Sequence, residues 1–149
     1  MAKYQPLALI AGDQEDLRTV SALLQDAIVK IGDTAYLREE RRFAFVANRY
    51  VWETARRSLF SQGQRVRTGV HFDDVREVKA RAVRMDAAEA LIDILSAEYE
   101  GDENGGTITL NLAGGGAIAL TVDAINVTMK DLSRPWRARR RPDHDGGGT

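Results

Sequence analysis

The stretch that decides the fold is GGTITLNLAGGGAIALTVDAINVTMKDL, residues 105–132. Apolar residues alternate with polar or small ones over 107–112, over 117–122 and again over 125–130. Such alternation with period two is typical of strands in an antiparallel sheet that covers a core on one side. The sequence therefore predicts a three-stranded meander, with the glycine triplet 114–116 as the turn of its first hairpin.

The clearest helix lies nearer the N-terminus. Asp13 can cap its first turn, and apolar residues recur at helical spacing from Leu17 to Leu24, so we expect one amphipathic helix that ends near Gln25. Most other elements are expected to be strands. In the first half of the chain we expect a strand at 7–10, a strand at 28–31 that ends at Gly32 and Asp33, and a hairpin over 36–46 with its turn at 38–41. A loop or short helix is expected at 54–65, followed by a long β segment over 66–83 that bends near Asp73 and Asp74. One helical turn at 86–91 and a strand through 95–99 complete the prediction.

These elements predict a single α+β domain over residues 1–133. Its core is expected to be a curved antiparallel sheet or partial β-barrel, pleckstrin-like or of split-barrel type, with one main N-terminal helix. From Ser133 onward Pro, Arg and Gly dominate and the apolar pattern stops. Residues 134–149 are therefore expected to form a basic C-terminal tail that is partly disordered.

Composition narrows the function classes. The chain has 149 residues and no cysteine, which excludes disulfides, thiolate metal sites and cysteine nucleophiles. The N-terminus lacks the apolar core of a secretion signal, and no apolar run approaches the roughly 20 residues that cross a bilayer. We therefore expect a cytoplasmic protein with no membrane partner, no cofactor and no metal.

The net charge of −1 hides a segregation by sign. Residues 34–84 carry twelve Arg or Lys against six acids, whereas residues 85–133 carry one Lys against nine acids. Seventeen of the 21 basic residues are Arg, which suits planar contacts with carboxylates and phosphates. Two interpretations stay open: the blocks neutralise each other within the fold, or the basic block meets a partner.

Few residues suggest catalysis or metal binding. His71 and Asp73 would share one face of a strand, as in a histidine oriented for base catalysis, but a surface His–Asp pair is the commoner arrangement. The acidic clusters at 73–74 and 102–104 lack the spacing of a calcium loop. The glycine triplet would need a helix behind it to bind phosphate, and a strand pattern follows instead. We predict no catalytic residue.

The segment RRFAFVANRYVWETARR, residues 41–57, combines arginines with aromatic residues. Its start matches in part the octamer with which RNA-recognition sheets stack bases, and Phe43 and Phe45 would be the stacking rings. Burying both rings instead gains about 3–5 kcal/mol of transfer free energy. We therefore predict that both rings belong to the core.

The tail RPWRARRRP, residues 134–142, is the better candidate for nucleic acid, because several guanidiniums flank one Trp. It could equally fold back onto the acidic segment 85–133, with Trp136 closing the bottom of the core. The residues predicted to contact a partner are arginines with one tryptophan: Arg41, Arg42, Arg49, Arg56, Arg57, Arg65, Arg67, Arg134, Trp136, Arg137, Arg139, Arg140 and Arg141.

Four segments carry a resemblance to a known family: DLRTVSALLQDAIVKIGDTAYL (16–37), RRFAFVANRYVWE (41–53), RVRTGVHFDDVREVKARA (65–82) and LSRPWRARRRPDH (132–144). Through them the chain is similar to a bacterial domain-of-unknown-function family of about this length. The resemblance implies a bacterial cytoplasmic protein. It supplies no activity and no catalytic residues.

The leading hypothesis is a non-catalytic binding or assembly module that contacts protein or nucleic acid through its arginine-rich surface, or associates with itself. One alternative is a small-molecule enzyme with His71, Asp73 and Asp102 nearest to its site. That alternative requires a concave pocket that gathers at least two titratable groups. A third hypothesis is a homodimer in which the basic block of one chain meets the acidic block of the other.

Overall fold

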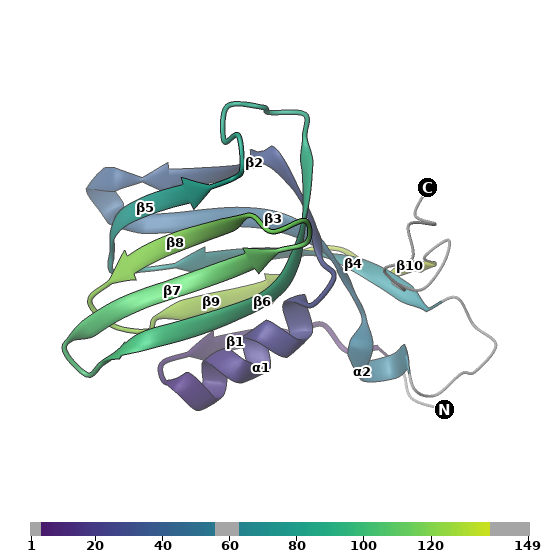
Figure 1. Ribbon diagram of the computed structural model, residues 1–149. Helices are drawn as coiled ribbons and strands as arrows, with labels where there is room; N and C mark the ends of the chain where they lie inside the picture. The colour runs from purple at the N-terminus through teal and green to yellow at the C-terminus, as the bar shows by residue number, and fades with distance from the viewer. Residues whose placement is uncertain (1–3, 56–62, 138–149) are drawn as a thin grey trace.

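The computed structural model describes residues 4–55 and 63–137 (Figure 1). Antiparallel strands make up most of it, with one main helix near the N-terminus, as the sequence predicts. In chain order the elements are β1 (Ala8–Ala11), α1 (Gln14–Leu24), β2 (Ile28–Leu37), the 3-10 turn η1 (Arg38–Glu40), β3 (Arg42–Tyr50), α2 (Trp52–Ala55), β4 (Gln64–Phe72), β5 (Val75–Arg81), β6 (Leu91–Asp102), β7 (Gly105–Leu112), β8 (Ala117–Val122), β9 (Val127–Asp131) and β10 (Trp136–Arg137).

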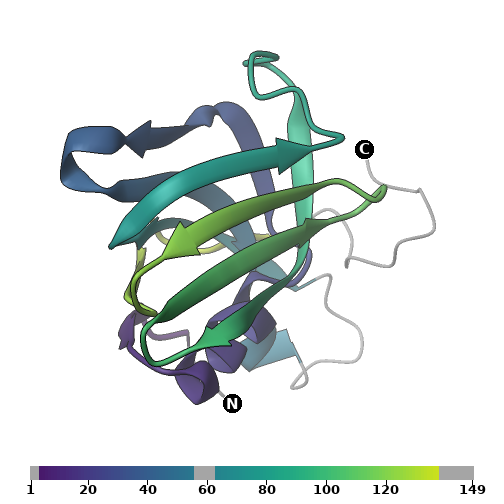
Figure 2. The same cartoon turned by 60° about the vertical axis from the view of Figure 1, so that its left-hand side comes forward.

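The strands of the described residues form one sheet, in the order β1-β9-β4-β3-β2-β6-β7-β8-β5, and the two-residue β10 adds to β4. This sheet is not closed into a barrel. Figures 1 and 2 show it curled, so that β6, β7, β8 and β5 form a layer that faces β2, β3, β4 and β9. The predicted α+β class with a curved antiparallel sheet is confirmed, in its open form.

The bend predicted at Asp73 and Asp74 carries the chain from one layer to the other. β4 lies inside one layer, whereas β5, which follows the bend, is the edge of the other. Asp74 has a left-handed backbone (φ 60°), which Asp tolerates better than most residues. Its carbonyl accepts the Asp123 N–H at 3.0 Å, and the Val75 N–H donates to the Arg41 carbonyl at 2.9 Å. These bonds hold the corner to the turns on either side.

The core lies between the two layers. Phe43 and Phe45 of β3 point into it beside Phe72 of β4, with neighbouring ring centroids 6.2 Å and 6.3 Å apart. This confirms that both rings of the 41–57 segment are core residues. The facing layer contributes the apolar residues of the alternating stretch, which are also buried: Ile108, Leu110, Leu112, Ile118, Leu120 and Val122.

Helix α1 packs its apolar face on this core. Asp13 caps the helix by accepting the Asp16 N–H at 2.8 Å, as predicted, and the helix ends at Leu24. Leu17, Val20 and Leu24 are buried, and the helix contacts β1, β3 and β6. Figure 1 shows α1 lying across the open side of the curl, so it shields the interior where the sheet does not close.

The predicted three-stranded meander is only partly correct. β7 and β8 form the expected hairpin, and Gly114 and Gly115 at its turn adopt positive φ values of 91° and 99°. β9, however, does not lie beside β8; it pairs with β1 and β4 in the other layer. Period-two alternation predicts that a segment is a strand, but it does not say which strand becomes its neighbour.

The expected end of the second strand is also wrong. β2 does not stop at Gly32 but continues to Leu37, with an irregularity in register between Val29 and Thr34. A local break in apolar pattern therefore marks a bulge here and not a strand end.

Residues 86–90 form turns and no helical turn. The carbonyls of Ala88 and Ala90 accept the N–H groups of Gly32 and Ile31, at 2.8 Å and 2.9 Å, so this loop is fastened to β2. The short helix α2 begins at Trp52, and most of the predicted 54–65 loop lies outside the described residues.

Candidate functional site

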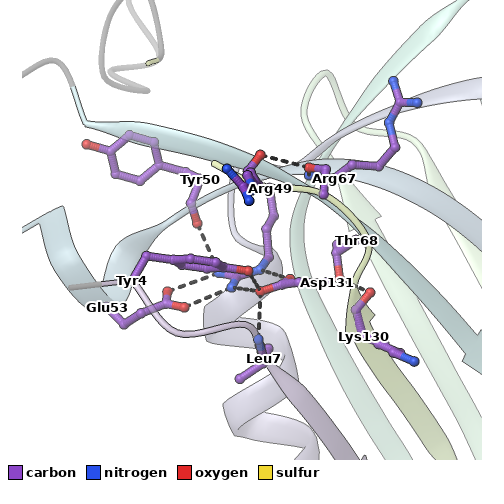
Figure 3. Close-up of polar contacts among 11 residues, drawn as sticks. Tyr4, Leu7, Arg49, Tyr50, Glu53, Arg67, Thr68, Lys130 and Asp131 are labelled. Carbon is purple, nitrogen blue, oxygen red and sulfur yellow. Dashed lines mark hydrogen bonds and ion pairs between the residues drawn. The ribbon is translucent and has the colours of Figure 1, made fainter. Parts of the chain in front are cut away.

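Arg49 of β3 belongs to the interior, with no exposed side-chain surface. Asp131 of β9 accepts from Nε at 3.0 Å and from Nη2 at 2.9 Å. Glu53 of α2 accepts from Nη1 at 3.0 Å and from Nη2 at 2.8 Å, and the Tyr50 carbonyl accepts from Nη1 at 3.4 Å. All five N–H donors of the guanidinium are thereby used (Figure 3).

Asp131 also fastens the N-terminal segment. Its Oδ2 accepts the Tyr4 hydroxyl at 2.5 Å and the Leu7 N–H at 2.9 Å. Burial by itself raises the pKa of the Asp131 carboxyl, but hydrogen bonds from Arg49, Tyr4 and Leu7 outweigh it and hold that pKa below its ordinary value. Burial and the bond to Asp131 raise the pKa of Tyr4. We call Tyr4, Arg49, Glu53 and Asp131 the Arg49 cluster.

The Arg49 cluster is structural and offers nothing to a ligand, because its donors are saturated. Arg49 is among the arginines predicted from the sequence to contact a partner. Its guanidinium is buried and fully bonded within the fold, so it has no free donor to offer one. A signal existed in the sequence. Arg49 is separated from Phe43 and Phe45 by an even number of residues, so its side chain lies on the same face of the strand as theirs. If both Phe rings point into the core, Arg49 is expected to point there too.

Several exposed arginines are paired with acids from the other charge block. Arg41 and Arg76 both bind Asp123, the second at 3.1 Å. The hydrogen bond from Arg76, then that from Arg41, lowers the pKa of Asp123. Arg84 binds Asp86 at 3.0 Å. The interpretation that the blocks neutralise each other is correct for these residues.

Arg65 is also occupied, by carbonyl oxygens. Its Nη1 donates to the Asn48 carbonyl at 2.9 Å and to the Asp26 carbonyl at 3.3 Å. Burial lowers the pKa of this guanidinium. Arg65 therefore helps to hold β4 against β3 and the end of α1, and little of it faces a partner.

Of the residues of the enzyme hypothesis, His71 and Asp73 contact each other. His71 Nδ1 lies 2.9 Å from Asp73 Oδ2, and Arg42 Nε donates to Asp73 Oδ1 at 2.7 Å, so Asp73 lies between the other two side chains and contacts both. The bond to Asp73 raises the pKa of Arg42. Asp102 lies in the β6–β7 turn, where its carboxylate accepts the Asn104 N–H at 2.8 Å.

A groove of about 440 Å³ lies between α1 and β6, and none of those residues lines it. Its titratable members are Arg18 and Glu98, and the Ser21 hydroxyl on its wall accepts the Ala97 N–H at 2.9 Å. In the described ranges, no group of three or more His, Cys, Asp or Glu could hold a metal ion. No described helix is long and apolar enough to cross a membrane.

A group of cations that pair with no acid in the described part of the chain lies where β4, β9 and β10 meet. The register places Lys130 opposite Gly69, two residues from Arg67 on the same face. The Leu132 N–H donates to the Arg67 carbonyl at 2.7 Å, and Trp136 lies opposite Arg65. We call this surface the β4–β10 patch; its members are Arg67, Lys130, Leu132, Arg134, Trp136 and Arg137, and all are exposed. Arg137 lies opposite Gln64, so it stands at the margin of the patch and projects from the other face of β10 than Trp136.

No carboxylate of the described chain lies within ion-pair distance of Arg67, Lys130, Arg134 or Arg137. Three of these four cations and Trp136 are among the residues predicted from the sequence to contact a partner, whereas Lys130 and Leu132 are not. Both sit in or beside the acidic block, and only the pairing of β9 with β4 brings them to the basic surface. The remaining predicted contact residues, Arg56, Arg57, Arg139, Arg140 and Arg141, lie outside the described residues.

The chain was compared with known families, curated proteins and solved structures. Residues 7–144 match the family described as "Protein of unknown function (DUF2948)". No curated protein and no solved structure matches the chain. The match spans nearly the whole sequence and includes all four segments that carried the resemblance. The chain belongs to the DUF2948 family.

Proposed function

We propose that this protein is a non-catalytic binding module that holds an anionic partner on the β4–β10 patch, and that the partner is single-stranded nucleic acid. The observation that carries the proposal is the contrast between paired and unpaired cations. Arg41, Arg42, Arg76 and Arg84 each meet a carboxylate, whereas no carboxylate of residues 4–55 and 63–137 pairs with a cation of the patch. Unpaired exposed cations that are grouped together are free to contact phosphates.

Trp136 adds an exposed aromatic ring to the cations of the patch. Its side chain is 39% exposed, and its indole N–H has no hydrogen-bond partner in residues 4–55 and 63–137. The other tryptophan, Trp52, behaves differently: it donates to the Gln25 carbonyl at 3.0 Å and stacks edge-on against Tyr50. Trp136 is thus the indole with a face left for a base.

Nucleic acid uses both features of the patch at once. A phosphate backbone contacts cations in a row, and an unpaired base stacks on an aromatic ring for about 1–3 kcal/mol. An acidic protein surface would use the cations but would not need the indole. In the sequence, Arg139, Arg140 and Arg141 follow within five residues of Trp136.

The test is a fluorescence anisotropy titration of labelled single-stranded RNA and DNA at low and at physiological salt. Trp136→Ala should weaken binding about 5- to 150-fold, the range that one stacked base represents. Arg67→Gln should weaken it as well. Arg76→Gln is the matched control, because it removes the same charge from an exposed arginine that is already paired with Asp123.

Three results would oppose this proposal. Absence of binding at low salt rules out phosphate contact. An equal loss of nucleic-acid affinity in Arg67→Gln and Arg76→Gln would mean that binding depends on the net charge of the protein and not on the patch. Binding of an acidic peptide in place of either nucleic acid would assign the surface to a protein partner.

The proposal also covers the source of the protein and its cellular compartment. We expect a bacterial, cytoplasmic protein, supported by the resemblance of the four segments and by a composition without cysteine.

A further inference from the structure

We propose that the chain forms a homodimer through the open edge of β1. In this dimer, β1 of one copy pairs antiparallel with β1 of a second copy around a two-fold axis beside Leu9. The inference does not depend on nucleic-acid binding, because it rests on the backbone of a different strand.

The pairing of β1 with β9 fixes which backbone groups are free. The Asp131 N–H donates to the Leu7 carbonyl at 2.9 Å, and Leu9 lies opposite Met129 in the same register. In an antiparallel pair, every second residue of a strand directs its backbone N–H and C=O groups toward the neighbouring strand. Because Leu7 does so, Leu9 also directs its N–H and C=O groups toward β9. The N–H and C=O groups of Ala8 and Ile10 therefore point away from it.

These edge groups have no partner in the part of the chain that the structure describes. Ala8 is exposed. Ile10 is 74% exposed, more than any other large apolar residue in the described part of the chain. An exposed row of free N–H and C=O groups is a template for a further strand.

The two edges of the sheet differ in protection. β5, at one edge, carries four charged residues among its seven, and charged side chains discourage strand pairing. β1, at the other edge, reads Ala-Leu-Ile-Ala and carries no charge. The asymmetry points to β1 as the edge that is left open for pairing.

A second copy fits this edge because the strand is self-complementary about Leu9. Ala8 of each copy then lies opposite Ile10 of the other, and the free N–H of one residue meets the free C=O of the other in both directions. Each bulky Ile10 packs beside a small Ala8. Pro6, which has no N–H, ends the ladder on each side.

The dimer would carry two β4–β10 patches on one face. Edge-to-edge antiparallel pairing keeps the outer faces of both sheets on the same side. Lys130 lies opposite Ala8 in the β1–β9 register, so each patch would begin one strand away from the dimer seam. A ligand that reaches both patches would gain from avidity.

Sedimentation equilibrium of the full chain over roughly 1–500 µM, a range that covers weak to moderate affinities, tests the dimer. The wild type should dimerise, and Ile10→Lys should raise the dissociation constant at least tenfold. Leu91→Lys is the matched control, since Leu91 is an exposed apolar residue, 67% exposed, at the start of β6. It should leave the constant unchanged.

Raising the salt concentration separates this dimer from one in which basic and acidic blocks attract. Edge pairing should persist at high salt, whereas a charge-driven dimer should dissociate. Amide exchange adds a direct readout: the Ala8 and Ile10 amides should become protected as concentration rises, while the Leu9 amide is protected throughout. A monomeric wild type, or a dimer that Ile10→Lys does not weaken, overturns the proposal.

Discussion

At the scale of single residues, the same side-chain type plays opposite parts in this protein. Arg49 lies inside the fold with every donor used, whereas Arg67 lies on the surface and pairs with no acid among the described residues. Both stand in segments that look alike in the sequence. The difference comes from strand parity and from Asp131, which is far away in the sequence and adjacent in the fold.

The Arg49 cluster should contribute strongly to stability. Asp131→Asn would leave the buried guanidinium with one carboxylate in place of two, and breaking a buried pair costs about 3–5 kcal/mol of unfolding free energy. Urea unfolding measures the loss. Asp123→Asn removes a carboxylate that pairs with two exposed arginines, and this control should change stability little. Similar losses in both variants would contradict the structural role of the cluster.

The pKa of Asp131 sets the direction of a pH effect. Its folded pKa lies below the ordinary value, so its contribution is fully present above the unfolded pKa of about 4 and is lost as pH falls through the folded pKa. The stability gap between wild type and Asp131→Asn should therefore narrow as the solution is acidified below that unfolded value. A gap independent of pH would show that the carboxylate charge is not responsible.

At the scale of elements, the sequence predicts those whose signal is local. The α1 cap at Asp13, the β7–β8 hairpin and the bend at Asp73 and Asp74 all depend on neighbouring residues, and the structure confirms them. The position of β9 depends on strands more than 50 residues away, so alternation alone could not predict it. The same holds for the β4–β10 patch, since Lys130 reaches it only through that pairing.

The junction between β3 and β4 offers a test of close packing. Gly63, just before β4, has a φ of 77°, and a Cβ there would lie 2.1 Å from the Tyr50 hydroxyl. Gly114, in the β7–β8 turn, has a φ of 91° with open space around it. Gly114→Ala should cost about 1 kcal/mol for its backbone, and Gly63→Ala should cost about 1–3 kcal/mol more because it presses on a buried ring.

Urea unfolding of the two alanine variants measures this difference. Both substitutions carry the backbone penalty, so the gap between them reports the packing of Gly63 on Tyr50. Equal losses of unfolding free energy in Gly63→Ala and Gly114→Ala would mean that the Tyr50 ring moves aside without strain.

At the scale of the whole molecule, the two interpretations of the charge segregation each describe a part of it. The corner near Asp123 joins basic and acidic blocks, so charges there are neutralised internally. The β4–β10 patch keeps its charge. Figure 1 shows β10 and the acidic β6–β7 turn at opposite ends of the molecule, so the acids of that turn do not cover the patch. The sequence could show the imbalance, but only the fold shows where it remains.

Salt dependence of binding tests the central claim most directly. For single strands, the logarithm of the binding constant should fall with the logarithm of salt concentration by about 0.7 per phosphate contact. Lys130→Gln should make that slope shallower by about this amount, since it removes one contact, while Arg76→Gln should leave it unchanged. A slope that is the same in wild type and Lys130→Gln, or no binding at low salt, would contradict the assignment of the patch.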